Sequence, residues 1–220
     1  MKREIITTAD GSSTIRLADW DETYHSRHGA IQEAYHVFIK NGLSVVNKPV
    51  LAILEIGFGT GLNALITLLE GSKRHTNIHY TGVEAYPVVE SELQKLNYIK
   101  ALQMGDRSQE FNLMHKATWG LDVQISEYFV LHKLKKDFAE ISDFQKYDLV
   151  YYDAFGARVQ PELWSEAMFL KMFNAMKTDG VLVTYAAKGS VRRAMQSVGF
   201  TVERLTGHPG KREMLRATKF

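Results

Sequence analysis

Residues 50–63 read Val50-Leu-Ala-Ile-Leu-Glu-Ile-Gly-Phe-Gly-Thr-Gly-Leu-Asn63. The first half of this segment is apolar except for Glu55, as expected of a strand that is buried on both faces of a parallel sheet. Glycines then occupy positions 57, 59 and 61, and apolar residues at helical spacing run from Leu62 to Leu69. The pattern predicts a strand, a glycine-rich turn and a helix, which form the opening unit of a doubly wound α/β fold.

Strands and helices alternate along the rest of the chain. Apolar runs predict further strands at 78–84, 128–134, 147–153, 181–186, 200–205 and 213–218. Helical spacing predicts helices at 89–102, 163–176 and 190–198. Such alternation produces a parallel sheet with helices on both faces, but the last two strands have no helix between them and form an antiparallel hairpin. We therefore expect a Rossmann-like, seven-stranded, mostly parallel sheet, with the C-terminal hairpin that is typical of class I methyltransferases.

The region before residue 50 forms a small appendage. Strand-like stretches at Glu4–Thr8 and Thr14–Leu17 flank Asp10-Gly11, a favoured turn pair, and predict a β-hairpin. Apolar residues at helical spacing predict a helix over Gly29–Lys40. With 220 residues the chain is long enough for one well-buried core, so we expect residues 1–49 to pack on a methyltransferase core at 50–220.

Composition excludes several classes of protein. The sequence has no cysteine, so disulfides, thiolate zinc sites and a cysteine nucleophile are excluded. The eight histidines are scattered without metal-ligand spacing, and no metal is expected. There is no apolar run long enough to cross a bilayer, and the first ten residues lack the build of a signal peptide. A soluble, cytoplasmic protein is expected.

The glycine turn indicates the ligand. Glycines let a ligand approach the backbone, and the helix that follows offers unpaired N–H groups, which bind a carboxylate as well as a phosphate. The spacing is G-x-G-x-G with Glu55 two positions earlier, rather than the G-x-G-x-x-G of nicotinamide or flavin binding. S-adenosylmethionine, which has a carboxylate and no phosphate, is therefore the preferred cofactor. The expected contacts are Glu55, Gly57, Phe58, Gly59, Thr60, Gly61 and Asn63.

The alternative to a cofactor site is a purely structural turn. In that case the glycines are needed only for packing, and Glu55 and Asn63 are turn or cap residues. Glu84 ends the second core strand, where an acidic side chain accepts hydrogen bonds from both ribose hydroxyls. Alone it would be a surface charge, but the glycine turn favours the ribose role. Asp137 either holds the adenine amino group or belongs to the solvated charge run Lys133-Leu-Lys-Lys-Asp137.

Asp153 is the main catalytic candidate. It follows the apolar run Leu149–Tyr152 and should lie at the end of that strand, beside the cofactor. Methyl transfer needs donor and acceptor held in line, and an amine acceptor must lose a proton that a partly buried carboxylate can accept. Phe155 would form an apolar wall around the acceptor. A capping role for Asp153 and a core role for Phe155 are the alternatives.

The C-terminal end is basic. Residues 181–220 hold eight Lys or Arg against two acidic residues, a net charge of +6, so the preceding residues carry −4 of the total of +2. Arg192 and Arg193 on a helix, and Lys211 and Arg212 on a loop, are candidates for phosphate contacts. A solvated cationic face is the alternative.

Together these motifs resemble one family. The chain resembles the methyltransferase domain of the bifunctional bacterial enzyme that completes 5-methylaminomethyl-2-thiouridine at the wobble position of transfer RNA, and its stand-alone relatives. The matching segments are Asp21-Glu-Thr-Tyr24-His-Ser26, Gly29-Ala-Ile-Gln-Glu33, Tyr35-His-Val-Phe38, Glu55–Asn63, Asp153-Ala-Phe155, Val191-Arg-Arg193, Gly199-Phe200 and Gly210-Lys-Arg-Glu-Met-Leu215. They span nearly the whole chain.

The resemblance implies methylation of the 5-aminomethyl group of a modified wobble uridine. It places Asp153 near the amine, Tyr24 in the substrate site and the basic C-terminal region toward transfer RNA. The flavin-dependent oxidase domain of the fused enzyme is absent from this sequence, so we expect that any removal of a carboxymethyl group occurs elsewhere or is not needed. The segments Gly156–Gln160 and Ala186–Gly189 differ from the fused form.

Two other functions remain open on the sequence. A methyltransferase of the same fold acting on a small-molecule amine or another RNA position is one, and its activity would depend only weakly on salt if the substrate is not RNA. A protein that binds the cofactor without catalysis is the other.

Overall fold

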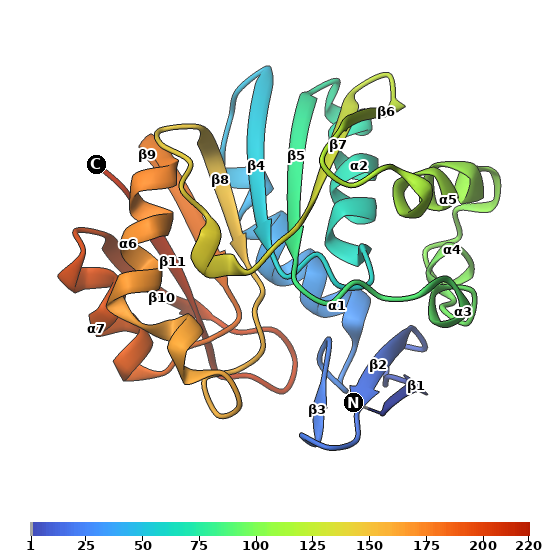
Figure 1. The fold of residues 1–220 in the computed structure, drawn as a ribbon, viewed down its shortest axis with the longest axis horizontal. Coiled ribbons are helices and arrows are strands. Elements are labelled where there is room, and N and C mark those ends of the chain that lie inside the picture. Colours follow the sequence, from blue (N-terminus) through green and yellow to red (C-terminus); the bar gives the residue numbers. More distant parts are fainter. Residues whose placement is uncertain (1) are drawn as a thin grey trace.

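The computed structural model describes residues 2–220, and two β-sheets organise them (Figure 1). The strands of the larger sheet are β4 (Val50–Ile56), β5 (Asn77–Glu84), β6 (Asp122–Ser126), β7 (Phe129–Lys135), β8 (Tyr147–Tyr152), β9 (Met176–Thr184), β10 (Thr201–Thr206) and β11 (Glu213–Thr218). Their order across the sheet is β10-β11-β9-β8-β4-β5-β7-β6. The strands from β9 to β7 pair in parallel, while β11, β10 and β6 are antiparallel to their neighbours. The expected class I methyltransferase fold, with its C-terminal hairpin, is confirmed.

Helices cover both faces of this sheet. They are α1 (Ala30–Ala34), which continues as a π-helix over Tyr35–Lys40, α2 (Leu62–Arg74), α3 (Glu90–Leu93), α4 (Tyr98–Ala101), α5 (Ser108–Lys116), α6 (Glu166–Ala175) and α7 (Gly189–Ser197). One buried apolar cluster joins the sheet to α1, α2, α4 and α5, and a second joins its other face to α6 and α7 (Figure 1). In the described part of the chain, no helix has the length and apolar character that a membrane span requires.

The core elements differ from expectation mainly in three places; in addition, β9 begins at Met176, five residues before the expected strand. The helix predicted at 89–102 is two short helices, because the side chain of Asn97 between them bonds to Gly11 O and accepts from Ser13 N at 2.8 Å each. Helix α5 was not predicted, because only Phe111 and Met114 of its residues are buried. Strand β6 makes the sheet eight-stranded rather than seven-stranded; it lies at an edge and carries only one buried residue, Ile125.

The smaller sheet lies at the N-terminus and extends the predicted hairpin by one strand. Its strands are β1 (Arg3–Thr7), β2 (Ser13–Leu17) and β3 (Glu22–Thr23), all antiparallel. In Figure 1 this sheet lies beyond the carboxyl ends of β4 and β5. It is therefore placed over the edge of the large sheet where ligands of α/β proteins bind.

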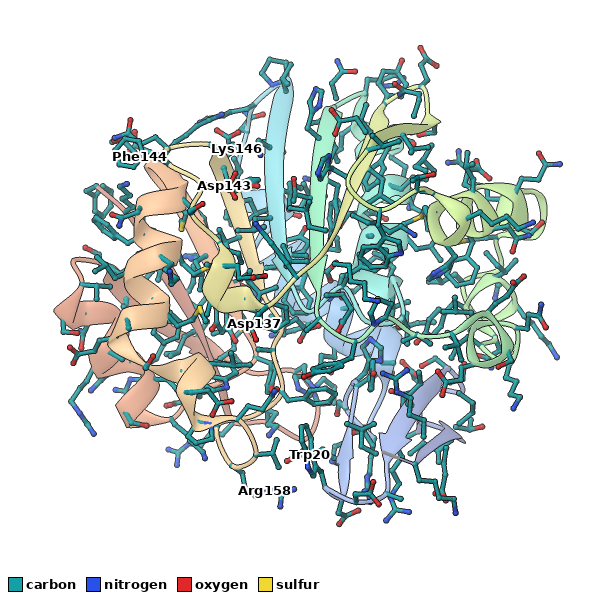
Figure 2. The ribbon with its side chains drawn as sticks, in the orientation of Figure 1. Trp20, Asp137, Asp143, Phe144, Lys146 and Arg158 are labelled. Atoms are coloured by element: carbon teal, nitrogen blue, oxygen red, sulfur yellow. The ribbon has the colours of Figure 1, made fainter. Side chains whose placement is uncertain are left out.

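Two sets of contacts fix the small sheet to the core. On one side Arg3 donates to Tyr86 O at 2.8 Å and pairs with Glu92 at 3.1 Å. On the other side Arg158 donates to Trp20 O at 2.7 Å and to Glu22 at 2.8 Å, and Figure 2 shows Trp20 and Arg158 near each other. The small sheet thus bridges the segment after β5 and the loop after β8.

Candidate active site

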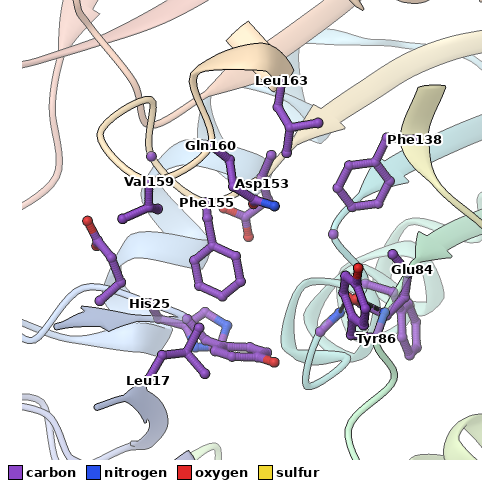
Figure 3. Close-up of a pocket in the computed structure, with 18 of the residues that line it drawn as sticks. Leu17, His25, Glu84, Tyr86, Phe138, Asp153, Phe155, Val159, Gln160 and Leu163 are labelled. Carbon is purple, nitrogen blue, oxygen red and sulfur yellow. Dashed lines mark hydrogen bonds between the residues drawn. The ribbon is translucent and has the colours of Figure 1, made fainter. Parts of the chain in front are cut away.

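A cleft of about 1080 Å³ opens between the small sheet and the carboxyl ends of β4, β5 and β8 (Figure 3). Its walls come from the small sheet, the glycine turn after β4 and the loops after β5, β7 and β8. This volume suits a ligand and an acceptor group together, because pockets for single small molecules span about 300–1,000 Å³.

The glycine turn is shaped by its neighbour. Gly57 has a φ of +90°, and a Cβ there would lie 2.7 Å from the backbone oxygen of Asp153. Only glycine allows this contact between the loops after β4 and β8. The turn therefore has the packing role of the structural alternative, yet it also leads into α2, whose first backbone N–H groups are available to an anion.

The carboxylate of Glu84 is positioned to bind the two hydroxyls of a diol. Its two carboxylate oxygens accept from Gly59 N at 3.0 Å and from Tyr86 N at 2.9 Å. Each oxygen keeps a further lone pair that can accept from a ribose hydroxyl. The side chain is buried and faces the cleft rather than bulk solvent, which argues against a plain surface charge.

Asp137 also lines the cleft, but it has a structural task. Its Oδ1 accepts from Ala139 N at 2.8 Å and caps the 3₁₀ helix Phe138–Glu140, while Glu140 bonds back to Asp137 N at 3.0 Å. The neighbouring ring of Phe138 lines the same end of the cleft (Figure 3). The helix cap is therefore a sufficient structural reason for a carboxylate at position 137. An additional contact between Asp137 and the adenine of the cofactor stays a prediction.

Asn63 joins the buried carboxylate of Glu55 to the half-buried carboxylate of Asp153 at the floor of the cleft. Its Nδ2 donates to Glu55 Oε1 at 2.9 Å and to Asp153 Oδ2 at 2.8 Å. Glu55 Oε2 and Asn63 Oδ1 are buried and have no hydrogen-bond partner among the described residues. Burial raises the pKa of Glu55 well above its usual range. Glu55 lies behind the cleft wall, where it positions Asn63 rather than facing the ligand.

Asp153 faces the cleft from a rigid loop. The Tyr185 hydroxyl donates to Ala154 O and the Trp164 indole donates to Phe155 O, each at 2.8 Å. Burial, and then the charge of Glu33, raise the pKa of Asp153 well above its usual range. The carboxylate accepts from a side-chain amide rather than from a helix end, so its contacts are not those of a helix cap.

An aromatic wall stands beside Asp153. The ring of Phe155 meets Tyr24 edge to face at 5.2 Å and Trp20 at 5.8 Å between ring centroids. Burial raises the pKa of Tyr24 to about 12. All three rings line the cleft, so a planar group can be held there by stacking and edge contacts.

The remaining sequence candidates divide into two groups. Phe58, Gly59, Thr60 and Lys211 line the cleft, and the ring of Phe58 also packs on Gly82 and Trp119. The residues outside the cleft lining are Gly61, Arg192, Arg193 and Arg212.

Among the cleft residues that the sequence analysis did not single out individually are Arg3, Trp20, Glu33 and Tyr185. Glu33 belongs to a segment that carries the resemblance, which is the signal that marks it. The other three reach the cleft from elements far apart in the chain, a placement that only the folded structure reveals.

Known proteins match the chain as follows. A family model described as S-adenosyl-L-methionine-dependent methyltransferase matches residues 95–220. The tRNA 5-methylaminomethyl-2-thiouridine biosynthesis bifunctional protein MnmC of Campylobacter fetus subsp. fetus is 28% identical over 205 residues, covering 90% of this chain and 33% of that protein. The protein of the same name from Pseudoalteromonas atlantica is 30% identical over 237 residues, covering 96% and 33%. The chain thus spans about a third of the length of these curated relatives.

Solved structures give the same picture of the fold. The crystal structure of MNMC2 from Aquifex aeolicus has a TM-score of 0.78 at 26% identity, covering 99% of this chain and 70% of that one. A spermidine synthase in complex with the transition-state analogue AdoDATO has a TM-score of 0.56 at 14% identity, covering 99% and 72%. The second likeness concerns the fold alone.

Proposed function

The chain belongs to the family of S-adenosyl-L-methionine-dependent methyltransferases, and we propose that it methylates the 5-aminomethyl group of a modified wobble uridine in transfer RNA. The observation that carries the proposal is the half-buried carboxylate of Asp153 beside the aromatic wall of Trp20, Tyr24 and Phe155, at the floor of the cofactor cleft. The names of the relatives in Campylobacter fetus and Pseudoalteromonas atlantica support the choice of transfer RNA.

The residues of the cleft fit S-adenosylmethionine. Glu84 can accept from its ribose, the first turn of α2 can receive its carboxylate, and Asp137 and Phe138 stand where its adenine would lie. The carboxylates of Glu33, which is buried, and Asp153, which is half-buried, give this part of the cleft the sign of charge that suits a sulfonium. When bound, the cofactor supplies an electrophilic methyl group that a nucleophile attacks in line.

The chain's own residues prepare the acceptor. The aromatic wall holds the uracil ring, and Asp153 binds and orients the amine at the floor of the cleft. Asn63 keeps the Asp153 carboxylate in place with a bond of 2.8 Å. The small sheet covers the cleft and keeps bulk water away from the reacting groups.

Exposed cations near the cleft support an RNA substrate. Lys188, Arg193, Lys211 and Arg212 are exposed and form no salt bridge with the described residues, in contrast to Arg204 and Arg216, which pair with Glu213 and Glu203. Cations without acidic partners remain available to phosphates. We propose that transfer RNA binds along this C-terminal surface, with Lys211 reaching the rim of the cleft.

The proposal is tested by incubating the protein with S-adenosylmethionine and transfer RNA that carries 5-aminomethyluridine, followed by nucleoside analysis. We expect conversion to 5-methylaminomethyluridine and a rate at low transfer RNA concentration that falls steeply as salt increases. Free small amines methylated equally well, with little salt dependence, would instead identify a small-molecule methyltransferase. Tight cofactor binding with no transfer to any amine or RNA would identify a non-catalytic binding protein.

A further inference from the structure

A second buried acid faces the acceptor side of the cleft. Glu33 on α1 is 7% exposed, and its Oε2 accepts from Ser26 N at 2.6 Å. Its Oε1 lies 2.8 Å from Nε2 of His208, which is 2% exposed and belongs to the loop between β10 and β11. The distance is that of an ion pair, while the imidazole nitrogen has no aligned hydrogen bond with any described residue. Nε2 of His208 is therefore buried beside a carboxylate without an aligned hydrogen bond to it.

Glu33 and Asp153 act on one another. Both line the cleft, and the charge of Glu33 is a leading cause, after burial, of the raised pKa of Asp153. Two buried carboxylates that repel one another are stabilised when a cation binds between them. An amine that enters as its ammonium form is such a cation. Free ammonium has no lone pair, so it must lose a proton before the nitrogen can attack a methyl group.

We propose that Glu33 is the second carboxylate that binds the acceptor ammonium, and that Glu33 and His208 together receive its proton. This inference rests on the proposed function, because it assumes an amine acceptor. One N–H bond of the ammonium breaks, its electron pair stays on the amine nitrogen, and the proton passes through the Glu33 carboxylate to Nε2 of His208. The products of this step are a neutral amine and an imidazolium paired with the Glu33 carboxylate, so charge and protons balance.

The surroundings favour His208 as the final proton acceptor. Asp153 already accepts from Asn63 at 2.8 Å, whereas Nε2 of His208 has no aligned hydrogen bond with the described residues. His25, another buried imidazole, has its pKa lowered to about 4 by burial and bonds through Nδ1 to Thr14 at 3.0 Å. The other titratable or charged groups around the pair are Tyr185, directly after β9, and His28, His36 and Lys211 around the 207–212 loop.

The test compares methyl transfer by Glu33→Gln and His208→Gln with that of the wild type across pH, using transfer RNA that carries 5-aminomethyluridine. Removing a general base lowers the rate by about 10²-fold or more near neutral pH. Aliphatic amines lose their proton near pH ~10, so a free amine becomes available in solution as pH rises. We therefore expect the difference in methyl-transfer rate between the wild type and each variant to decrease steadily as pH increases toward that value.

Two controls separate this effect from damage to the fold. Glu127→Gln removes an exposed acid at the turn between β6 and β7, at the opposite end of the strands, and should behave as wild type. Binding of S-adenosylhomocysteine, measured by calorimetry, should be nearly unchanged in all three variants. A loss in the Glu33 and His208 variants that stays constant across pH, or full activity in both, overturns the inference. A wild-type protein that forms no methylated nucleoside contradicts the proposed function itself.

Discussion

At the scale of single residues, Asp153 illustrates how an active site costs stability. Burial raises the pKa of Asp153 well above its ordinary value of 3.8, so the folded protein retains this proton at pH values where the unfolded chain has lost it. The unfolded state then binds fewer protons, and stability falls as pH rises above that ordinary value. The site keeps the carboxylate in spite of this cost, as expected of a functional group.

Replacement of Asp153 by Asn should therefore stabilise the protein at neutral pH. We expect the free energy of unfolding to rise by about 1–3 kcal/mol, the usual cost of a buried group that is poorly satisfied, with the gain disappearing in acid. Denaturant unfolding of both proteins at several pH values measures this difference. The same variant should bind the cofactor nearly as well as wild type while turnover falls by about 10²-fold or more. A variant that is less stable at neutral pH, or that turns over normally, contradicts this role.

Gly57 makes a second prediction at this scale. Replacement of Gly57 by Ala places a Cβ 2.7 Å from Asp153 O, on a backbone with a φ of +90°. Gly120 has a similar φ of +82°, but a Cβ there would meet no atom within 4 Å, so Gly120→Ala is a matched control for backbone strain alone. Both changes should cost about 1–2 kcal/mol of strain. Only Gly57→Ala should also weaken cofactor binding, measured by calorimetry; equal binding in both variants would argue against the packed turn.

At the scale of elements, the N-terminal sheet forms one wall of the cleft and is fixed by contacts between distant parts of the chain. Arg158 lies in the loop after β8, and it reaches back to Trp20 and Glu22. Its side chain is 59% exposed, so the ion pair contributes little to global stability. Its role is to hold Trp20 against Phe155.

Replacement of Arg158 by Ala should therefore raise the KM for the acceptor several-fold and leave the melting temperature and cofactor affinity almost unchanged. Arg16→Ala is the control, because Arg16 also forms exposed ion pairs in the small sheet, with Glu4 and Asp21, but does not bond to Trp20. Steady-state kinetics with transfer RNA as the varied substrate measure the effect. An unchanged KM, or equal effects from both variants, would mean that the wall does not depend on this contact.

Elements with a strong local pattern were predicted almost residue by residue. Strands β4 and β11 have the expected bounds, because the apolar residues of a buried or well-paired strand are enough to predict where it begins and ends. Helices α3 and α4 were not separated, since the break at Asn97 depends on a contact with Ser13. In the same way, the sequence predicted the glycine turn, Glu84 and Asp153 as site residues because each lies at the end of a strand. It did not predict Trp20 and His208, because only the folded chain brings them near these residues.

At the scale of the whole molecule, charge is divided between an acidic cleft and a basic C-terminal surface. The cleft contains buried carboxylates that suit a sulfonium and an ammonium, and the C-terminal surface exposes cations without acidic partners among the described residues. This division lets one protein attract a polyanion while it places a cationic group of that polyanion beside a cationic cofactor.

Joint replacement of Lys211 and Arg212 by Ala should weaken transfer RNA binding and make it less sensitive to salt. Each lost phosphate contact lowers the slope of log affinity against log salt by about 0.7–0.9, so the pair should lower it by up to about 2. Arg216→Ala is the control on the same hairpin, because Arg216 is paired with Glu203 at 2.9 Å. Filter binding at several salt concentrations gives the slopes. Identical slopes for the double variant and wild type would place the RNA elsewhere.

The central claim is that one cleft presents the cofactor to an acceptor amine at Asp153. The crystal structure of the protein with bound S-adenosylmethionine tests it most directly. The account predicts both ribose hydroxyls within hydrogen-bond distance of the Glu84 carboxylate and the methyl group directed toward the space between Asp153 and Phe155. A cofactor bound away from Glu84, or a methyl group directed away from Asp153, would contradict it.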